Sequence, residues 1–186
     1  HMQAVGYDLY CKMLNEAVKT LKGIPTIEDF NTVVDLDADA YIPPSYIVNE
    51  IQKLDIYKRI AGIEDEKECD DMREELLDRF GEIPKSAANL LRIALIRSHA
   101  HHLYITELKG KNEVLQMILR QDAPIVVENI PVLLQEYGGK MTFEPKGTPT
   151  FRLRYRKCGV IEKDEETLLS LTAETLRRME EILLTQ

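Results

Sequence analysis

The chain has 186 residues, of which 44% are hydrophobic and 30% are charged, a composition typical of a globular protein with one well-filled core. Its net charge of −8 disfavours non-specific nucleic-acid binding as the main role, since such binding depends on an excess of basic residues. No apolar run approaches the roughly 20 residues that span a bilayer, so we expect no membrane partner.

The N-terminal part of the chain predicts one helix and one strand. His1-Met2 is typical of the remnant of an affinity tag and is left out of the fold prediction; the chain is expected to be a piece of a larger protein. Apolar residues recur at three- and four-residue spacing over about residues 7–22, which predicts a helix that ends at Gly23. Residues 32–36 are short and rich in β-branched side chains, which predicts a strand.

Three further helices are expected after this strand. The first, about residues 46–60, would be capped by Ser45 and end at Gly62. Its apolar stripe contains Ile47, Ile51, Leu54, Tyr57 and Ile60. The second helix, about residues 66–80, would bury Met72, Leu76, Leu77 and Phe80. The third, residues 85–102, repeats the same apolar spacing.

After about residue 103 the apolar period shortens and predicts strands. Segments 103–108 and 114–119 would form a hairpin around the turn-like Lys109-Gly-Lys-Asn. A short helix is expected over residues 131–137, capped by Asn129 and ended by Gly138. Segments 141–144 and 150–156 are predicted as two more strands. A closing helix would bury Leu168, Leu171, Thr172, Thr175, Leu176, Met179 and Leu183.

These elements predict an α+β fold in a single domain, residues 3–186. The part from about 7 to 102 would be helical, and the part from about 103 to 184 would mix strands and helices. The helical N-terminal half would pack with a small, mainly antiparallel sheet and a closing C-terminal helix.

No catalytic or cofactor-binding site is predicted. The Gly138-Gly139-Lys140 and Gly110-Lys111 segments lack the spacing and the following hydroxyl of a phosphate-binding loop. No Gly-x-Ser-x-Gly motif is present. Cys11, Cys69 and Cys158 are odd in number, far apart and in no CxxC pair, which favours reduced thiols, a cytoplasmic location and no disulfide framework. We therefore expect no enzyme in this fragment.

His99, His101 and His102 cluster at the end of a predicted helix, where His99 and His102 lie three residues apart on one face. Metal binding is one interpretation. The other is that imidazoles favour a helix C-terminus because of its negative dipole end and bare carbonyls. No cysteine or carboxylate joins them at ligand spacing in the sequence, so the second is preferred and no metal site is predicted.

Arg152, Arg154 and Arg156 alternate with Phe151, Leu153 and Tyr155, so they would share one face of a strand. The face could bind phosphates of a nucleic acid, which is the alternative function that we carry forward. It is also what the solvent face of an amphipathic strand looks like, with charges that prevent edge pairing.

The largest charge asymmetry lies in residues 64–82, where ten acidic residues stand against Lys67, Arg73 and Arg79. Asp71, Glu74, Glu75 and Asp78 recur at three- and four-residue spacing, so they form one acidic face of the predicted helix. A solvated helix face is the common meaning of such a pattern. The functional interpretation is a docking surface for arginines of a partner, because carboxylates pair with guanidinium groups in a defined geometry.

Several segments resemble one family in order and spacing. They are Tyr7-Asp-Leu-Tyr10, Ile42-Pro43 before Tyr46-Ile47, Tyr57-Lys-Arg-Ile-Ala61, and Glu75-Leu-Leu-Asp-Arg-Phe-Gly81 followed by Pro84. Together they resemble the C-terminal domain of the bacterial transcription-repair coupling factors (the Mfd family). The resemblance covers the first hundred residues, and the sheet half rests on its own periodicity.

The resemblance implies a function in transcription-coupled nucleotide excision repair. The parent protein would be a cytoplasmic ATP-driven DNA translocase that removes stalled RNA polymerase, with ATP and Mg²⁺ bound in a motor outside this fragment. The C-terminal domain would be non-catalytic and autoinhibitory: it would pack on the UvrB-like module of the same chain, mask the surface that UvrA binds, and restrain the motor. The family's acidic contact pair corresponds to Glu75 and Asp78, which we place at the centre of the docking face, with Asp71 and Glu74 as flanking charges.

Overall fold

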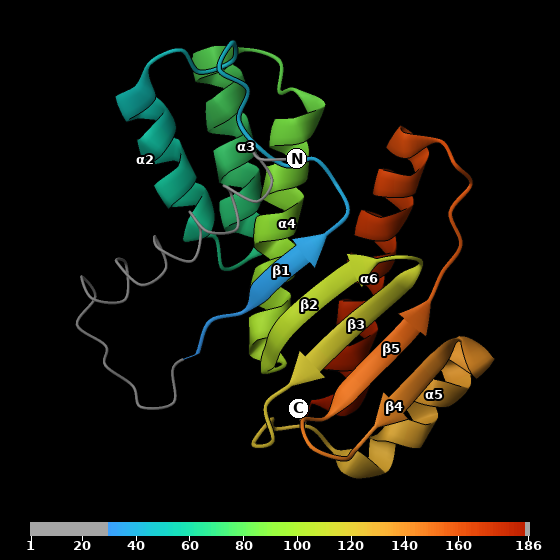
Figure 1. Cartoon of the computed structure of the whole chain (residues 1–186). Coiled ribbons are helices and arrows are strands. Elements are labelled where there is room, and N and C mark those ends of the chain that lie inside the picture. Colours follow the sequence, from blue (N-terminus) through green and yellow to red (C-terminus); the bar gives the residue numbers. More distant parts are fainter. Residues whose placement is uncertain (1–29, 185–186) are drawn as a thin grey trace. The chain divides into compact units, whose positions relative to one another are not determined.

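The structure is a computed structural model that describes residues 30–184 and divides into two compact units. The helical unit contains the described residues 30–31 and 38–98, and the sheet unit contains residues 32–37 and 99–184. The elements include a five-stranded mixed sheet and a long C-terminal helix, which confirms the α+β prediction (Figure 1). The expected helix over residues 7–22 lies outside the described residues.

The helical unit consists of α2 (Glu50–Ala61), α3 (Glu66–Phe80) and most of α4 (Lys85–His102) (Figure 1). Asn49 caps α2 by accepting a hydrogen bond from the backbone N–H of Gln52, and Asp65 caps α3 by accepting one from Glu68. The core is built from large side chains that are almost fully buried: Ile47, Ile56, Ile60, Met72, Leu76, Leu90 and Leu91. The predicted bounds of α3 and α4 are confirmed.

The burial pattern of α2 and α3 differs from the prediction. The helix α2 begins at Glu50 and is capped by Asn49, so the predicted cap at Ser45 is wrong. Ile47 is buried, but in the turn before the helix; Ile60 is buried within α2 as predicted, whereas the middle of the predicted stripe faces solvent. Ile51 is 80% exposed and Leu54 is 45% exposed. Leu77 of α3 is 47% exposed, so its predicted burial is also wrong.

The sheet has the strand order β1-β2-β3-β5-β4. Its strands are β1 (Val33–Leu36), β2 (Ile105–Lys111), β3 (Val114–Leu119), β4 (Met141–Glu144) and β5 (Thr150–Arg154). The pairing of β1 with β2 is parallel and the other three pairings are antiparallel, which confirms a mainly antiparallel sheet. The hairpin of β2 and β3 is confirmed, but it turns at Asn112-Glu113, both with φ near +60°, because Lys109 to Lys111 continue the strand.

One face of the sheet is covered by α6 (Ile161–Leu183), which passes behind the strands in Figure 1. Leu168 of α6 and Leu36 of β1 lie close to the backbone of Gly110 in β2. A Cβ atom added at Gly110 would lie 2.8 Å from Leu36 Cδ2 and 2.9 Å from Leu168 Cδ1. Glycine is therefore favoured there by the limited space, since a larger residue would have to displace the ends of both leucine side chains. The buried residues of α6 include six of the seven predicted ones; Leu171 is half-buried.

The helix α5 (Ile130–Tyr137) packs on α6 and ends at Gly138, as predicted. Asn129 occupies the N-cap position of α5, as predicted, but its side chain makes no cap hydrogen bond and donates instead to the backbone carbonyl of Ile182. Across the residues that the structure describes, we find no helix with the length and apolar character needed to cross a bilayer.

Candidate protein-docking site

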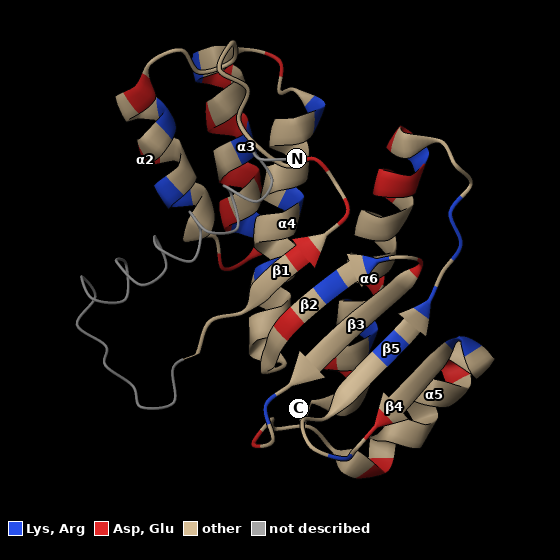
Figure 2. Ribbon diagram, in the orientation of Figure 1, with Lys and Arg blue, Asp and Glu red and all other residues tan. Residues whose placement is uncertain are grey.

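The acidic face of α3, formed by Asp71, Glu74, Glu75 and Asp78, lies on one side of a helix whose opposite side is buried. The buried residues are Cys69, Met72 and Leu76. Because successive acidic residues are three or four positions apart, their side chains point from the same helix surface. Figure 2 shows acidic residues along most of the length of α3.

Glu75 is held by two arginines of its own unit. Its carboxylate pairs with both terminal nitrogens of Arg59 from α2, one of them at 2.7 Å, and with Nη1 of Arg79 at 2.9 Å. The hydrogen bond from Arg59, followed by that from Arg79, lowers the pKa of Glu75 to about 2. Glu75 therefore stays ionised at neutral pH, and its charge is compensated inside the helical unit.

The other three acidic residues are less constrained. Asp71 pairs with Lys67 one turn earlier at 2.9 Å, and its side chain is 60% exposed. The side chains of Glu74 and Asp78 are exposed, and within residues 30–184 neither makes a hydrogen bond or a direct ion pair, although the pKa of Lys67, raised mainly by its hydrogen bond to Asp71, is also raised by the charge of Glu74. The four predicted residues thus share one face, and among the described residues of the unit the carboxylates of Glu74 and Asp78 are the two that make no direct contact with a basic side chain.

The end of α3 is fixed by aromatic and hydrogen-bond contacts. The Phe80 ring packs on Tyr46 with 5.8 Å between ring centroids, and the guanidinium of Arg79 lies 4.9 Å above Phe80. The Tyr46 hydroxyl oxygen lies 2.9 Å from the backbone carbonyl oxygen of Gly81 and 3.1 Å from that of Leu76, so the two carbonyls share its single proton. These contacts hold the C-terminal end of the helix that carries Glu74 and Asp78 in a fixed position.

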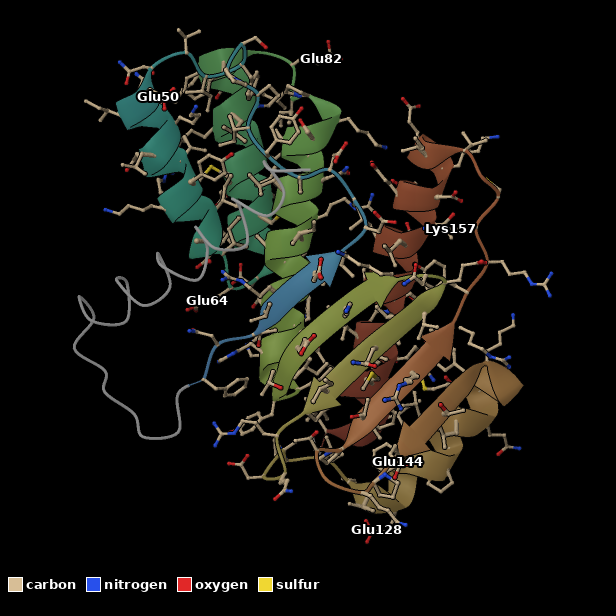
Figure 3. The ribbon with its side chains drawn as sticks, viewed as in Figure 1. Glu50, Glu64, Glu82, Glu128, Glu144 and Lys157 are labelled. Atoms are coloured by element: carbon tan, nitrogen blue, oxygen red, sulfur yellow. The ribbon has the colours of Figure 1, made fainter. Side chains whose placement is uncertain are left out.

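Glu64 and Glu82 extend the negative charge beyond both ends of α3, as their positions in Figure 3 show. The carbonyl of Glu64 accepts a hydrogen bond from the Ser98 hydroxyl at 2.7 Å, which fixes the α2–α3 connection to α4. The acidic surface is thus longer than the four predicted residues.

Sequence reasoning missed one feature of the helical unit that bears on docking. Among the described residues of this unit, four large apolar side chains are exposed: Val48, Ile51, Leu54 and Leu77. Leu77 directly precedes Asp78 in α3. Interfaces combine apolar contacts with charges, so these side chains are suited to a docking surface. The helical spacing of Ile51, Leu54 and Leu77 suggested burial, and no sequence signal distinguished these three from core residues.

The predicted arginine face is shorter than expected. Arg152 and Arg154 lie on the exposed side of β5, whereas Arg156 follows the end of the strand, so its predicted place in β5 is wrong. Arg152 donates to Gln116 Oε1 at 3.2 Å, and Arg154 donates to the Gly139 carbonyl at 2.8 Å. Two exposed guanidinium groups remain on this face.

The predicted histidine cluster is divided. His101 lies 3.3 Å from the Thr32 hydroxyl through its Nδ1 atom. His99 and His102 share the other side of the α4 end, where Glu180 of α6 joins them. Glu180 is 81 residues from His99 in the sequence, which is why spacing could not reveal it.

Comparisons with known proteins agree on one family. A family model described as the TRCF domain matches residues 36–130. The transcription-repair-coupling factor of Staphylococcus aureus (strain USA300) is 41% identical over 131 residues, which cover 69% of this chain and 11% of that protein. The corresponding protein of Staphylococcus haemolyticus (strain JCSC1435) is 38% identical over 124 residues, which cover 66% of this chain and 11% of that protein.

One solved structure is similar to this chain over most of the length of both chains. It is described as the crystal structure of the C-terminal domain of a transcription-repair coupling factor. The TM-score is 0.66 at 26% identity, and the match covers 82% of this chain and 95% of the solved chain. The chain therefore corresponds to about one tenth of the length of its full-length relatives and to nearly all of this solved domain.

Proposed function

This chain belongs to the transcription-repair coupling factor family as a C-terminal domain, and we propose that it is a non-catalytic docking domain whose acidic α3 face binds the UvrB-like module of its parent protein. Docking there would mask the surface that UvrA binds and restrain an ATP-driven DNA translocase. UvrA and RNA polymerase would act on the docked state indirectly, DNA would contact other parts of the parent protein, and the complex would work in the cytoplasm.

The observation that carries this proposal is the uneven compensation of charge on α3. Arg59 and Arg79 neutralise Glu75 from within the helical unit, whereas the side chains of Glu74 and Asp78 are exposed and make no hydrogen bond or direct ion pair among the described residues. A rigid helix that presents uncompensated carboxylates suits arginines of a partner, since charge-assisted bidentate pairs give orientation as well as attraction.

The same geometry gives Glu75 a different role from the one that the family resemblance suggests. We propose that Glu75 positions α3 against α2 by holding Arg59, and that Glu74 and Asp78 make the intermolecular charge contacts. A contact built on exposed charges is reversible and weakens with salt, as an autoinhibitory contact between domains must be.

The test is a titration of this domain against the UvrB-like module of its parent at low and moderate salt. The double variant Glu74→Arg, Asp78→Arg should bind at least about tenfold more weakly, because it replaces two attractive contacts with repulsive ones. The matched control is Glu128→Arg, Glu144→Arg, which makes the same change of charge at exposed positions of the sheet unit (Figure 3).

Equal affinities of the wild type and the Glu74, Asp78 double variant would refute the assignment of the surface. An equal loss of affinity in the control variant would show that binding depends on the net charge of the domain and not on the acidic face of α3. No binding by the wild type at low salt would contradict the docking function itself.

The alternative function, nucleic-acid binding by Arg152, Arg154 and Arg156, has weaker support. The first two already donate hydrogen bonds within the sheet unit, and the third lies outside the strand. Binding that depended on these arginines would weaken with salt by a slope of about −0.9 for each phosphate contact on duplex DNA. A fluorescence anisotropy titration of the triple alanine variant would detect the loss of such a slope.

A further inference from the structure

We propose that His99, His102 and Glu180 form a binding site for one divalent transition-metal ion, with Zn²⁺ as the best-suited ion. The site lies within the sheet unit, where the last turn of α4 meets α6. The proposal uses neither the acidic face of α3 nor the docking function, so it stands or falls independently of both.

The geometry brings three ligand atoms together. His99 and His102 are three residues apart on α4, with their rings nearly perpendicular and their centroids 6.5 Å apart. His99 Nδ1 lies 2.8 Å from Glu180 Oε1. One ligand atom from each of the three side chains lies within 4.8 Å of the other two.

These distances are compatible with zinc. Bonds of about 2.0–2.1 Å in a tetrahedron place ligand atoms about 3.4 Å apart, so the pair of His99 and Glu180 is already closer than that. The ligand atom of His102 has to move by no more than about 1.4 Å, a distance that a side-chain rotation covers because His102 is exposed.

The donor set also favours a transition metal. Two imidazoles and one carboxylate are the ligands of three-ligand zinc sites, in which water completes the coordination. A site with two imidazole ligands is a poor match for Mg²⁺ and Ca²⁺, because these ions prefer oxygen ligands. The exposure of His102 leaves the fourth position open to water.

Glu180 is available because its neighbours on α6 engage other groups. Arg177 pairs with Glu174 and Glu181, and Arg178 pairs with Glu136 and Glu181. The carboxylate of Glu180 contacts His99, across 81 residues of sequence. A metal ion would replace the shared proton of this contact and tie the end of α4 to α6.

The experiment is a titration of chelator-treated protein with ZnCl₂, followed by isothermal calorimetry, and with CoCl₂, followed by visible absorption. The protein lacks His1-Met2 and carries Cys11→Ser and Cys158→Ser, which remove the N-terminal histidine and two competing thiols; Cys158 is exposed. We expect one ion per chain and cobalt bands typical of four-coordinate nitrogen and oxygen ligation.

Two variants and two matched controls test the ligands. His102→Ala and Glu180→Gln should each weaken zinc binding by at least about 100-fold, since losing a direct ligand costs no less than losing a supporting residue. His101→Asn changes a neighbouring histidine, and Glu181→Gln changes a neighbouring carboxylate. Both variants should bind zinc as tightly as the cysteine-substituted chain without these changes. Zinc should also raise the thermal unfolding midpoint of the cysteine-substituted chain and leave that of its His102→Ala variant unchanged.

His102 is an exposed residue at the end of α4, so its alanine variant tests the site even if Glu180→Gln folds poorly. Absence of saturable zinc binding would overturn the proposal. So would binding that both ligand variants retain, because the ion would then be held elsewhere on the chain.

Discussion

The ion pairs of Glu75 predict a measurable contribution to the stability of the helical unit. The substitution Glu75→Gln keeps the shape of the side chain and removes the charge that Arg59 and Arg79 share. The matched control is Asp78→Asn, which removes a charge from the same helix face at a residue without an intramolecular partner among the described residues.

The magnitude follows from the depressed pKa. A shift of the Glu75 pKa from 4.5 to about 2 corresponds to about 3 kcal/mol of unfolding free energy if solvent did not screen the pairs. The Glu75 side chain is 30% exposed and that of Arg59 is 42% exposed, so screening reduces the expected loss to about 1 kcal/mol. Asp78→Asn should change the free energy by less than about 0.5 kcal/mol.

The assay is urea unfolding followed by far-ultraviolet circular dichroism from neutral pH to about pH 2. A carboxylate with a lowered pKa stabilises the folded state above its unfolded pKa, so the deficit of Glu75→Gln should be complete above about pH 5 and disappear as the pH falls towards 2. Equal stabilities of the two variants at neutral pH would refute the reasoning. A deficit of Glu75→Gln that persisted at pH 2 would also refute it, because the loss would then come from packing.

Three further measurements test the fold. Gly110→Ala should lower the unfolding free energy by about 1–2 kcal/mol, because the new methyl group meets buried leucine side chains, whereas Gly139→Ala, with nothing within 4 Å, should have little effect; equal losses would contradict the close approach. Asn49→Ala should cost about 1 kcal/mol as the loss of a helix cap, and Ser45→Ala should be near neutral; the reverse order would restore the predicted cap. In a Cys11→Ser background, Cys158 should react with iodoacetamide much faster than Cys69, because the Cys69 thiol is buried and that burial raises its pKa. Comparable reaction rates of the two thiols would show that α3 opens readily.

The order and type of most described elements could be predicted because hydrophobic periodicity and helix punctuation are local signals. The bounds of α3 and α4 agree with the prediction, as does the β2–β3 hairpin. The side that α2 buries could not be predicted in the same way. Ile47 satisfies the helical spacing, but it lies in the turn before α2 and its side chain is buried in the core. Ile51 and Leu54, which share that spacing, are exposed to solvent. The extent of the single predicted domain stays a prediction.

The candidate site was predictable only as a helix face. The spacing of Asp71, Glu74, Glu75 and Asp78 placed them on one side of α3, and their role in docking stays a prediction. Which of them is compensated depended on Arg59, a residue of another helix, and no local pattern encodes that partner. Tertiary packing likewise decided that Glu180 joins the histidines of α4.

The parallel pairing of β1 with β2 also constrains how the chain is made. The edge strand β1 leaves the ribosome before the whole of residues 38–98, and its partner emerges only after them. At about 5–20 residues per second, β1 waits several seconds without a neighbour, during which the intervening helices can already form. A shortened version that began after residue 38 would lack β1 and leave one side of β2 unpaired, an open template for aggregation.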